Sequence, residues 1–258
     1  QSADAIRSEL WWCAELARAG LPVPAAVPLP EGGLLAVLAG GRMASVVAWV
    51  EGEPLGEAGM PLAGSADAQA LQHHALGRLL AQVHAATDGL VLPDWFARPN
   101  WDRDGLVGEA PFWGRFWEHP ALNAAEAGLL AEARGWLAVQ LASHDGAPGL
   151  IHADVLRENV LVDGGSLALI DFDDSGFGYR THDLGTVLSQ DLYEPAYADL
   201  RAALCEGYGR VDPAQVDAFT LARTLASVGW AAPRLPPGHP VHASHIARAV
   251  MLARRCLR

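Results

Sequence analysis

The sequence predicts an α+β fold in two parts, a small N-terminal part of one helix and short strands and a larger, mostly helical part. Apolar residues recur at helical spacing at the start of the chain and again after its first quarter, whereas short apolar runs bounded by glycine cluster at residues 34–50 and 150–171. A Gly- and Pro-rich stretch, residues 51–65, separates the two helical regions. We therefore divide the chain into residues 1–52 and residues 53–258.

The N-terminal part opens with a helix predicted over residues 3–19. Its apolar residues have helical spacing, and Gly20 followed by Leu-Pro-Val-Pro cannot continue it. The runs at 34–38 and 45–50 predict two antiparallel strands joined by a turn at Gly40 and Gly41. Residues 51–65 read as a linker.

The larger part begins with a helix predicted from Asp67 to Ala86. We place four apolar residues on one face of this helix: Leu71, Ala75, Leu79 and Val83. A second helix is predicted over 123–143. The runs LIHAD, NVLVD and LALID then predict a β-rich island, with Gly164 and Gly165 between the last two. Four further helices are predicted at 181–191, 194–208, 212–229 and 241–256.

Composition narrows the classes of partner. The chain has 258 residues, 51% of them hydrophobic, a formal charge of −12 and no lysine. The negative charge argues against a nucleic-acid partner, which needs clustered basic residues, and it agrees weakly with a cationic substrate. No apolar stretch reaches the ~20 residues that span a bilayer, so we expect no membrane segment and a cytoplasmic protein. Three widely separated cysteines suggest neither a zinc site nor a disulfide framework.

The segment that carries chemistry is His152-Ala-Asp154-Val-Leu-Arg-Glu-Asn159, followed by Ile170-Asp171-Phe172-Asp173. Phosphoryl transfer needs a carboxylate facing the acceptor hydroxyl, and oxygen ligands that hold Mg²⁺ against the nucleotide phosphates. Asp154 and Asn159 precede one predicted strand and Asp171 ends the next. A β-hairpin between them would bring one base and two metal ligands to the same edge.

This HxDxxxxN pattern with an apolar-Asp-aromatic-Asp run resembles the catalytic and metal-binding loops of the aminoglycoside phosphotransferase, choline kinase and homoserine kinase family. The resemblance implies a two-lobed protein-kinase-like fold with ATP and Mg²⁺ as cofactors and a small-molecule alcohol as acceptor. By the same resemblance, Asp154 accepts the proton of the acceptor hydroxyl, Asn159 and Asp171 bind Mg²⁺, and His152 supports the loop. Asp183 matches a position that steadies the catalytic loop.

The resemblance covers the smaller lobe in part. Residues 45–54 look like the last strand of the N-terminal sheet and the hinge, which implies adenine contacts from the carbonyl of Ala48 and the amide of Val50. Glu9 resembles the glutamate that pairs with a phosphate-binding lysine. That lysine belongs on an earlier strand, and the chain contains none. We therefore expect the N-terminal lobe to be incomplete, with its first three strands outside this sequence.

Purely structural roles are an alternative for several of these residues. An isolated Asp-x4-Asn is common in turns. Asp173 and Asp174 either touch substrate or metal or are solvated turn residues. We expect His84 to be a buried structural histidine, and the tryptophans to serve the core or the lobe interface, although Trp113 or Trp117 could meet a cationic substrate.

Three rival functions remain open from the sequence. The IDFDDSGFG stretch resembles a bacterial branch that includes a stress-response kinase acting on serine and threonine in proteins. A catalytically silent nucleotide-binding module would keep the fold without transfer. A metal-dependent hydrolase would need histidine ligands beside the carboxylates, and His152 alone supports it poorly. The acceptor and the oligomeric state do not follow from the sequence.

Overall fold

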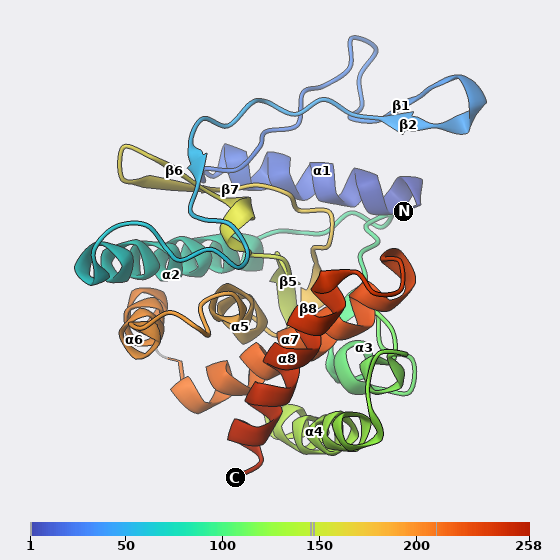
Figure 1. Ribbon diagram of the computed structural model, residues 1–258. Helices are drawn as coiled ribbons and strands as arrows, with labels where there is room; N and C mark the ends of the chain where they lie inside the picture. Colours follow the sequence, from blue (N-terminus) through green and yellow to red (C-terminus); the bar gives the residue numbers. More distant parts are fainter. Residues whose placement is uncertain (1, 145, 147, 210) are drawn as a thin grey trace.

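The computed structural model describes residues 2–144, 146, 148–209 and 211–258. The N-terminal part lies along one side of a larger helical body (Figure 1). Helix α1, Ala3–Arg18, begins at an N-cap where the Ser2 hydroxyl accepts a hydrogen bond from the Ala5 amide. The predicted first helix is therefore confirmed.

The strands after α1 are shorter than predicted and shifted. Strand β1, Ala36–Val37, pairs antiparallel with β2, Met43–Ala44, across a turn at Gly40 and Gly41, which both have positive φ. The prediction of a strand over 45–50 was wrong, because this segment makes only an isolated bridge between Ala26 and Val47. The side chains of residues 45–49 are exposed, so no packing against a core stabilises a longer strand there.

Two three-stranded sheets form the β-rich island. Strands β3 (Glu53–Pro54), β6 (Val160–Asp163) and β7 (Ser166–Leu169) make an antiparallel sheet in that order. Strands β4 (Asn100–Trp101), β8 (Gly176–Gly178) and β5 (Gly149–Ile151) make the other. The predicted linker thus contains strand β3, whose residues pair with Leu161 and Val162.

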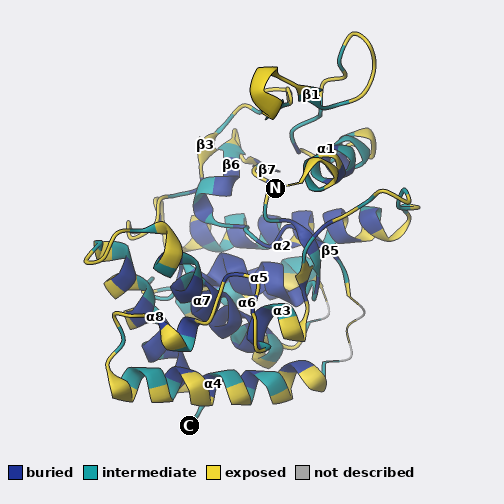
Figure 2. Cartoon of the chain, turned by 90° about the vertical axis from the view of Figure 1, so that its right-hand side faces the viewer, coloured by how far each residue is buried: buried dark blue, intermediate teal, exposed yellow. Residues whose placement is uncertain are grey.

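Seven further α-helices of the described chain build the larger body. The bounds are α2 Ala66–Asp88, α3 Arg103–Val107, α4 Ala124–Ala142, α5 Thr181–Ser189, α6 Tyr197–Tyr208, α7 Pro213–Arg234 and α8 Pro240–Cys256. All predicted helices are present, while the short α3 and strands β4 and β8 were not anticipated. Every residue of α5 is buried, so this helix is the centre of the body (Figure 2).

Two hydrophobic clusters hold the body together. In one, Trp12 and Leu16 of α1 pack with residues of α2, α5 and α6. The other joins α3, α4, α7 and α8. Because α1 shares its core with the larger part, the first helix is anchored against the elements that carry the predicted catalytic loop.

The buried face of α2 differs from the prediction. Leu79 and Val83 are buried, but Leu71 is 72% exposed. Two histidines, His73 and His84, are buried in its place, each within hydrogen-bonding distance of a buried carboxylate. A prediction based on apolar residues alone misses a buried helix face that contains hydrogen-bonded polar side chains.

Candidate active site

The hairpin β6–β7 brings the predicted catalytic residues together. Its register pairs Val160 with Leu169, and the Ile170 amide donates to the Asn159 carbonyl at 3.0 Å. Asn159 therefore precedes one strand and Asp171 follows the other at the same end of the hairpin. The turn at the opposite end uses Gly164 and Gly165, both with positive φ.

Asp183, at the start of the buried helix α5, holds the loop that precedes this hairpin. Its two carboxylate oxygens accept the amides of His152 at 2.9 Å and Ala153 at 2.7 Å. One of them also lies 3.0 Å from Nε2 of His84. Burial alone would raise the pKa of Asp183, but the hydrogen bond from His84 and the nearby charges outweigh burial and lower the pKa.

This grip explains a strained backbone. Ala153 has φ +67°, a left-handed conformation that alanine rarely adopts. Such strain persists only where the surroundings fix it, and here Asp183 binds the consecutive amides of His152 and Ala153. The result directs Asp154, the next residue, toward the cavity.

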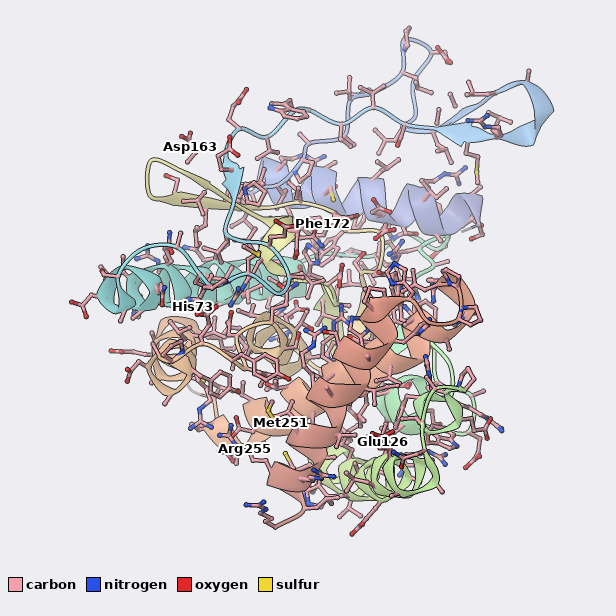
Figure 3. All side chains as sticks on the ribbon, in the orientation of Figure 1. His73, Glu126, Asp163, Phe172, Met251 and Arg255 are labelled. Atoms are coloured by element: carbon pink, nitrogen blue, oxygen red, sulfur yellow. The ribbon has the colours of Figure 1, made fainter. Side chains whose placement is uncertain are left out.

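His152 ties the two loops to each other. Its Nε2 lies 2.9 Å from the carbonyl oxygen of Ile170, and the centre of its ring lies 4.3 Å from the centre of the Phe172 ring. Phe172 in turn contacts Trp12 of α1 edge-on, and it lies between α1 and the helical body (Figure 3). Ile170, the residue before Asp171, is thereby held by His152. Phe172, the residue after it, is held by His152 and Trp12.

Asp154 is held at both carboxylate oxygens. Oδ2 accepts a hydrogen bond from Nδ2 of Asn159 at 3.0 Å. Oδ1 accepts a hydrogen bond from Nη2 of Arg223, on α7, at 2.6 Å. Sequence reasoning missed Arg223, since nothing in the local pattern of α7 links it to a loop 69 residues earlier.

A group of carboxylates follows β7. Asp171, with φ +64°, shares a side-chain hydrogen bond with Asp173. Burial, then the charge of Asp173, raises the pKa of Asp171 to about 6, and the same two causes raise the pKa of Asp174 to about 6. A cation placed among these carboxylates would relieve both effects.

The donor set fits Mg²⁺. Asn159 uses its amide nitrogen to bond Asp154, which leaves its neutral oxygen for a metal. Asp171 supplies a carboxylate whose pKa is raised first by burial and then by the charge of Asp173. Magnesium in kinases takes one or two such side chains together with phosphate oxygens and water. Among the described residues no three His, Cys, Asp or Glu side chains form a metal-binding group, so the histidine-rich arrangement of a hydrolase is not seen there.

Arg98 is a second residue that the sequence did not reveal. It donates to the carbonyls of Phe172 at 3.2 Å, Asp173 at 2.5 Å and Ser175 at 2.7 Å, and to the carbonyl of Ala5 in α1. It therefore fastens the acidic segment to the first helix. Its guanidinium also lies 3.8 Å from the carboxylate of Glu9, although Glu9 was expected to pair with a lysine.

Glu9 faces the acidic segment from α1. Burial raises the pKa of Glu9 to about 7 despite the opposing charge of Arg98, and the carboxylates of Asp173 and Asp171 add to the rise. The side chain is 21% exposed. The pairing of Glu9 with a phosphate-binding lysine remains a prediction.

A buried ionic network anchors the other side of the catalytic loop. Arg157 donates to Asp191 from Nε at 2.9 Å and from Nη2 at 2.7 Å, and to Glu194 at 2.7 Å. Its Nη1 reaches the carbonyl of Met60 at 2.7 Å. The stretch predicted to be a linker is thus bound to the loop between Asp154 and Asn159.

The predicted hinge contacts lie in an extended segment. The amide of Ala48 donates to Ala25 at 2.8 Å, while the carbonyl of Ala48 and the amide of Val50 make no backbone–backbone hydrogen bond within the described part of the chain. Both groups stay available to a ligand. Their assignment to adenine remains a prediction.

The tryptophans divide between core and site. Trp12, Trp101 and Trp113 are buried, as predicted for packing residues. The guanidinium of Arg223 lies 4.6 Å from the ring centre of Trp113, and that of Arg134 lies 4.1 Å from Trp117. Arginines of the protein itself therefore stack on Trp113 and Trp117, the two rings that the sequence suggested as contacts for a cationic substrate.

One cavity unites these side chains. Its volume is about 590 Å³. The residues that line it from the catalytic and metal loops are Asp154, Leu156, Glu158, Asn159, Asp171, Asp173 and Asp174. Those from α7 and α8 are Arg223, Ser227, Trp230, Arg234, Val241, His245 and Arg248, with Trp113, Ala58, Ser189 and Gln190 completing the wall.

No helix of the described residues combines the length and apolarity that crossing a bilayer requires.

Comparison with known proteins shows which family this chain resembles. The model of the phosphotransferase enzyme family matches residues 1–219. The homoserine kinase of Rhizobium etli (strain CIAT 652) is 34% identical over 207 residues, which cover 77% of this chain and 58% of that enzyme. The chain thus spans less than two thirds of the length of this curated relative.

Solved structures agree on the fold. The microcompartment-associated aminopropanol kinase superposes with a TM-score of 0.85 at 28% identity, covering 100% of this chain and 82% of that one. An amicoumacin kinase solved with AMP-PNP, Ca²⁺ and Ami gives a TM-score of 0.74 at 18% identity over 99% of this chain and 78% of that one. The predicted two-lobed, protein-kinase-like α+β fold is confirmed. The chain belongs to the phosphotransferase enzyme family.

Proposed function

We propose that this chain is the catalytic part of a kinase that uses ATP and Mg²⁺ to phosphorylate a hydroxyl group of a small molecule. The observation that carries the proposal is the convergence of Asp154, Asn159 and Asp171 on one cavity. Family membership and the homoserine and aminopropanol kinases among its relatives favour a small alcohol as the acceptor. We therefore prefer this function to a protein kinase or a silent module.

Each residue has a role that its contacts support. Asp154, with both oxygens held by Asn159 and Arg223, orients the acceptor hydroxyl and takes its proton at the carboxylate. Asn159 and Asp171 would hold Mg²⁺, which when bound neutralises phosphate charge during transfer. His152 and Asp183 fix the positions of these groups without touching the reactants.

The test is transfer of the γ-phosphoryl group from ATP to a panel of small alcohols, followed by phosphorus NMR. We expect product with at least one alcohol in the presence of Mg²⁺. Asp154→Asn should lower the rate by about 10²- to 10⁴-fold, the usual contribution of a general base, and should still bind the nucleotide. A chain that binds the nucleotide but phosphorylates none of the panel would contradict the proposal.

A further inference from the structure

The cavity has two walls of opposite charge. The catalytic and metal loops supply its carboxylates, Asp154 and the group around Asp171, together with Glu158. The wall from α7 and α8 contains no Asp or Glu among its described lining residues, but three arginines and one histidine. A metal and phosphates account for the first wall. The arginines of the second wall call for an anion of their own.

Two arginines of the second wall, Arg223 and Arg248, keep donors that no group of the described chain accepts, although Arg223 also bonds Asp154 and Ser227. Arg223 is 4% exposed, and its Nε finds no hydrogen-bond partner within the described chain. Arg248 is partly buried; its Nε also has no partner there, and its one recorded hydrogen bond is a long 3.4 Å contact with the carbonyl of Ser189. A guanidinium can donate five hydrogen bonds, so both retain unused donors.

The same two side chains repel each other. Burial lowers the pKa of Arg248, and the charge of Arg223 lowers it further. His245, on the turn of α8 before Arg248, has its pKa lowered to about 4 by burial and then by the charge of Arg248. Two neighbouring, desolvated guanidinium groups that share the single carboxylate of Asp154 are costly unless a further anion joins them.

On this basis we infer that the acceptor alcohol carries an anionic group, a carboxylate or a phosphate, which Arg248 and the free donors of Arg223 bind while Asp154 faces the hydroxyl. The inference rests on the proposed function, since it names the substrate class of the same site. Because Arg223 also bonds Asp154, an anion on Arg223 and a hydroxyl facing Asp154 would lie close together, as two groups of one small molecule can. Guanidinium groups suit this task because their planar donors match both anions.

Calorimetric titration without nucleotide tests the inference with pairs of alcohols that differ in one group. Homoserine is compared with 3-amino-1-propanol, which lacks only the carboxylate, and glycerol 3-phosphate is compared with glycerol. We expect the anionic member of at least one pair to bind roughly ten- to a hundredfold more tightly, as for a hydrogen bond to a charged group. The pair that shows the preference identifies the anion.

Two variants assign the effect to the second wall. Arg248→Gln should abolish the preference, whereas Arg254→Gln, which removes an exposed arginine from the same helix, should retain it. Thermal unfolding of both variants checks that they are folded. Equal binding of both members of each pair, no binding of any member, or a preference that survives in Arg248→Gln would overturn the inference.

Binding of ATP and Mg²⁺ to the same preparation separates this outcome from the proposed function. If the nucleotide binds and the anionic alcohols show no preference, the anion site is wrong and the kinase assignment stands. If the alcohols show the preference but the nucleotide does not bind, the anion site stands and the kinase assignment fails.

Discussion

Asp183 shows how one buried carboxylate shapes a catalytic loop. It satisfies two backbone amides and a histidine in a place where water cannot. Without it, the left-handed conformation of Ala153 loses two amide hydrogen bonds that support it, and we expect Asp154 to lose its direction. In the proposed function, Asp183 would therefore affect the reaction only by positioning Asp154.

Asp183→Asn should destabilise the fold by about 3–5 kcal/mol, because an amide nitrogen replaces one acceptor and leaves a buried donor unpaired. Urea unfolding followed by tryptophan fluorescence measures this loss. Asp94→Asn changes an exposed carboxylate outside the site and should alter the unfolding free energy by less than about 0.5 kcal/mol. Equal effects of the two substitutions would contradict the role given to Asp183.

Glu9 predicts a dependence of stability on pH. Its pKa is about 7 in the folded chain, against 4.5 for an unperturbed glutamate. The stabilisation from the protonated form is complete below pH 4.5 and is lost as pH rises through 7. The unfolding free energy of the parent should therefore fall between pH 5 and 8, relative to that of Glu9→Gln, by about 1–3 kcal/mol. Parallel pH profiles of the two proteins would rule out the raised pKa.

The residue scale is also where the sequence was least informative. The motif residues Asp154, Asn159 and Asp171 could be predicted, because a short hairpin fixes their separation. Arg98 and Arg223 could not, since each reaches its partners across about 70 residues or more. An arginine in a helix or loop has no local signal that distinguishes a solvated side chain from one that reaches a catalytic loop.

At the scale of elements, helices meet at glycines. A Cβ at Gly185 of α5 would lie 2.4 Å from the Phe219 carbonyl carbon and 2.5 Å from the Thr220 nitrogen in α7. Similarly, a Cβ at Gly207 of α6 would lie 1.9 Å from the carbonyl oxygen of His74 in α2. These contacts bring backbone against backbone and set the spacing of the helices beneath the site.

Gly185→Ala should therefore destabilise the chain by roughly 1–3 kcal/mol through overpacking. Gly135→Ala, in the middle of α4 with nothing within 4 Å of the added Cβ, should instead stabilise it by about 0.5–1 kcal/mol. Thermal unfolding of the two variants beside the parent provides the comparison. A stabilising Gly185→Ala would show that α5 and α7 are less closely packed than described.

Element prediction worked where burial follows a local period and failed where long-range pairing decides. The long helices α4, α7 and α8 have both periodicity and clear ends. Strands β4 and β8 have two and three residues, and β8 pairs with both β4 and β5, so no segment signals them alone. The predicted strand over 45–50 was apolar enough but found only one bridge.

At the scale of the whole molecule, the site lies where separate parts meet. The hairpin supplies Asn159 and Asp171, α7 and α8 supply the basic wall, and helix α1 brings Glu9 near the acidic segment. The network of Arg157 and the contacts of Arg98 join these parts. The division at residue 52 remains a prediction, although the core that α1 shares with α2 shows that the two parts pack closely.

The most direct test of this account is calorimetric titration of the chain with ATP and Mg²⁺, beside Asp171→Ala and the matched control Asp163→Ala. Asp163 lies at the turn end of the same hairpin (Figure 3), and it is not one of the described residues that line the cavity. Losing even an outer partner of a metal ligand costs about 10- to 100-fold in affinity, so Asp171→Ala should lose at least that much while Asp163→Ala binds like the parent. Equal binding by all three chains would contradict the account.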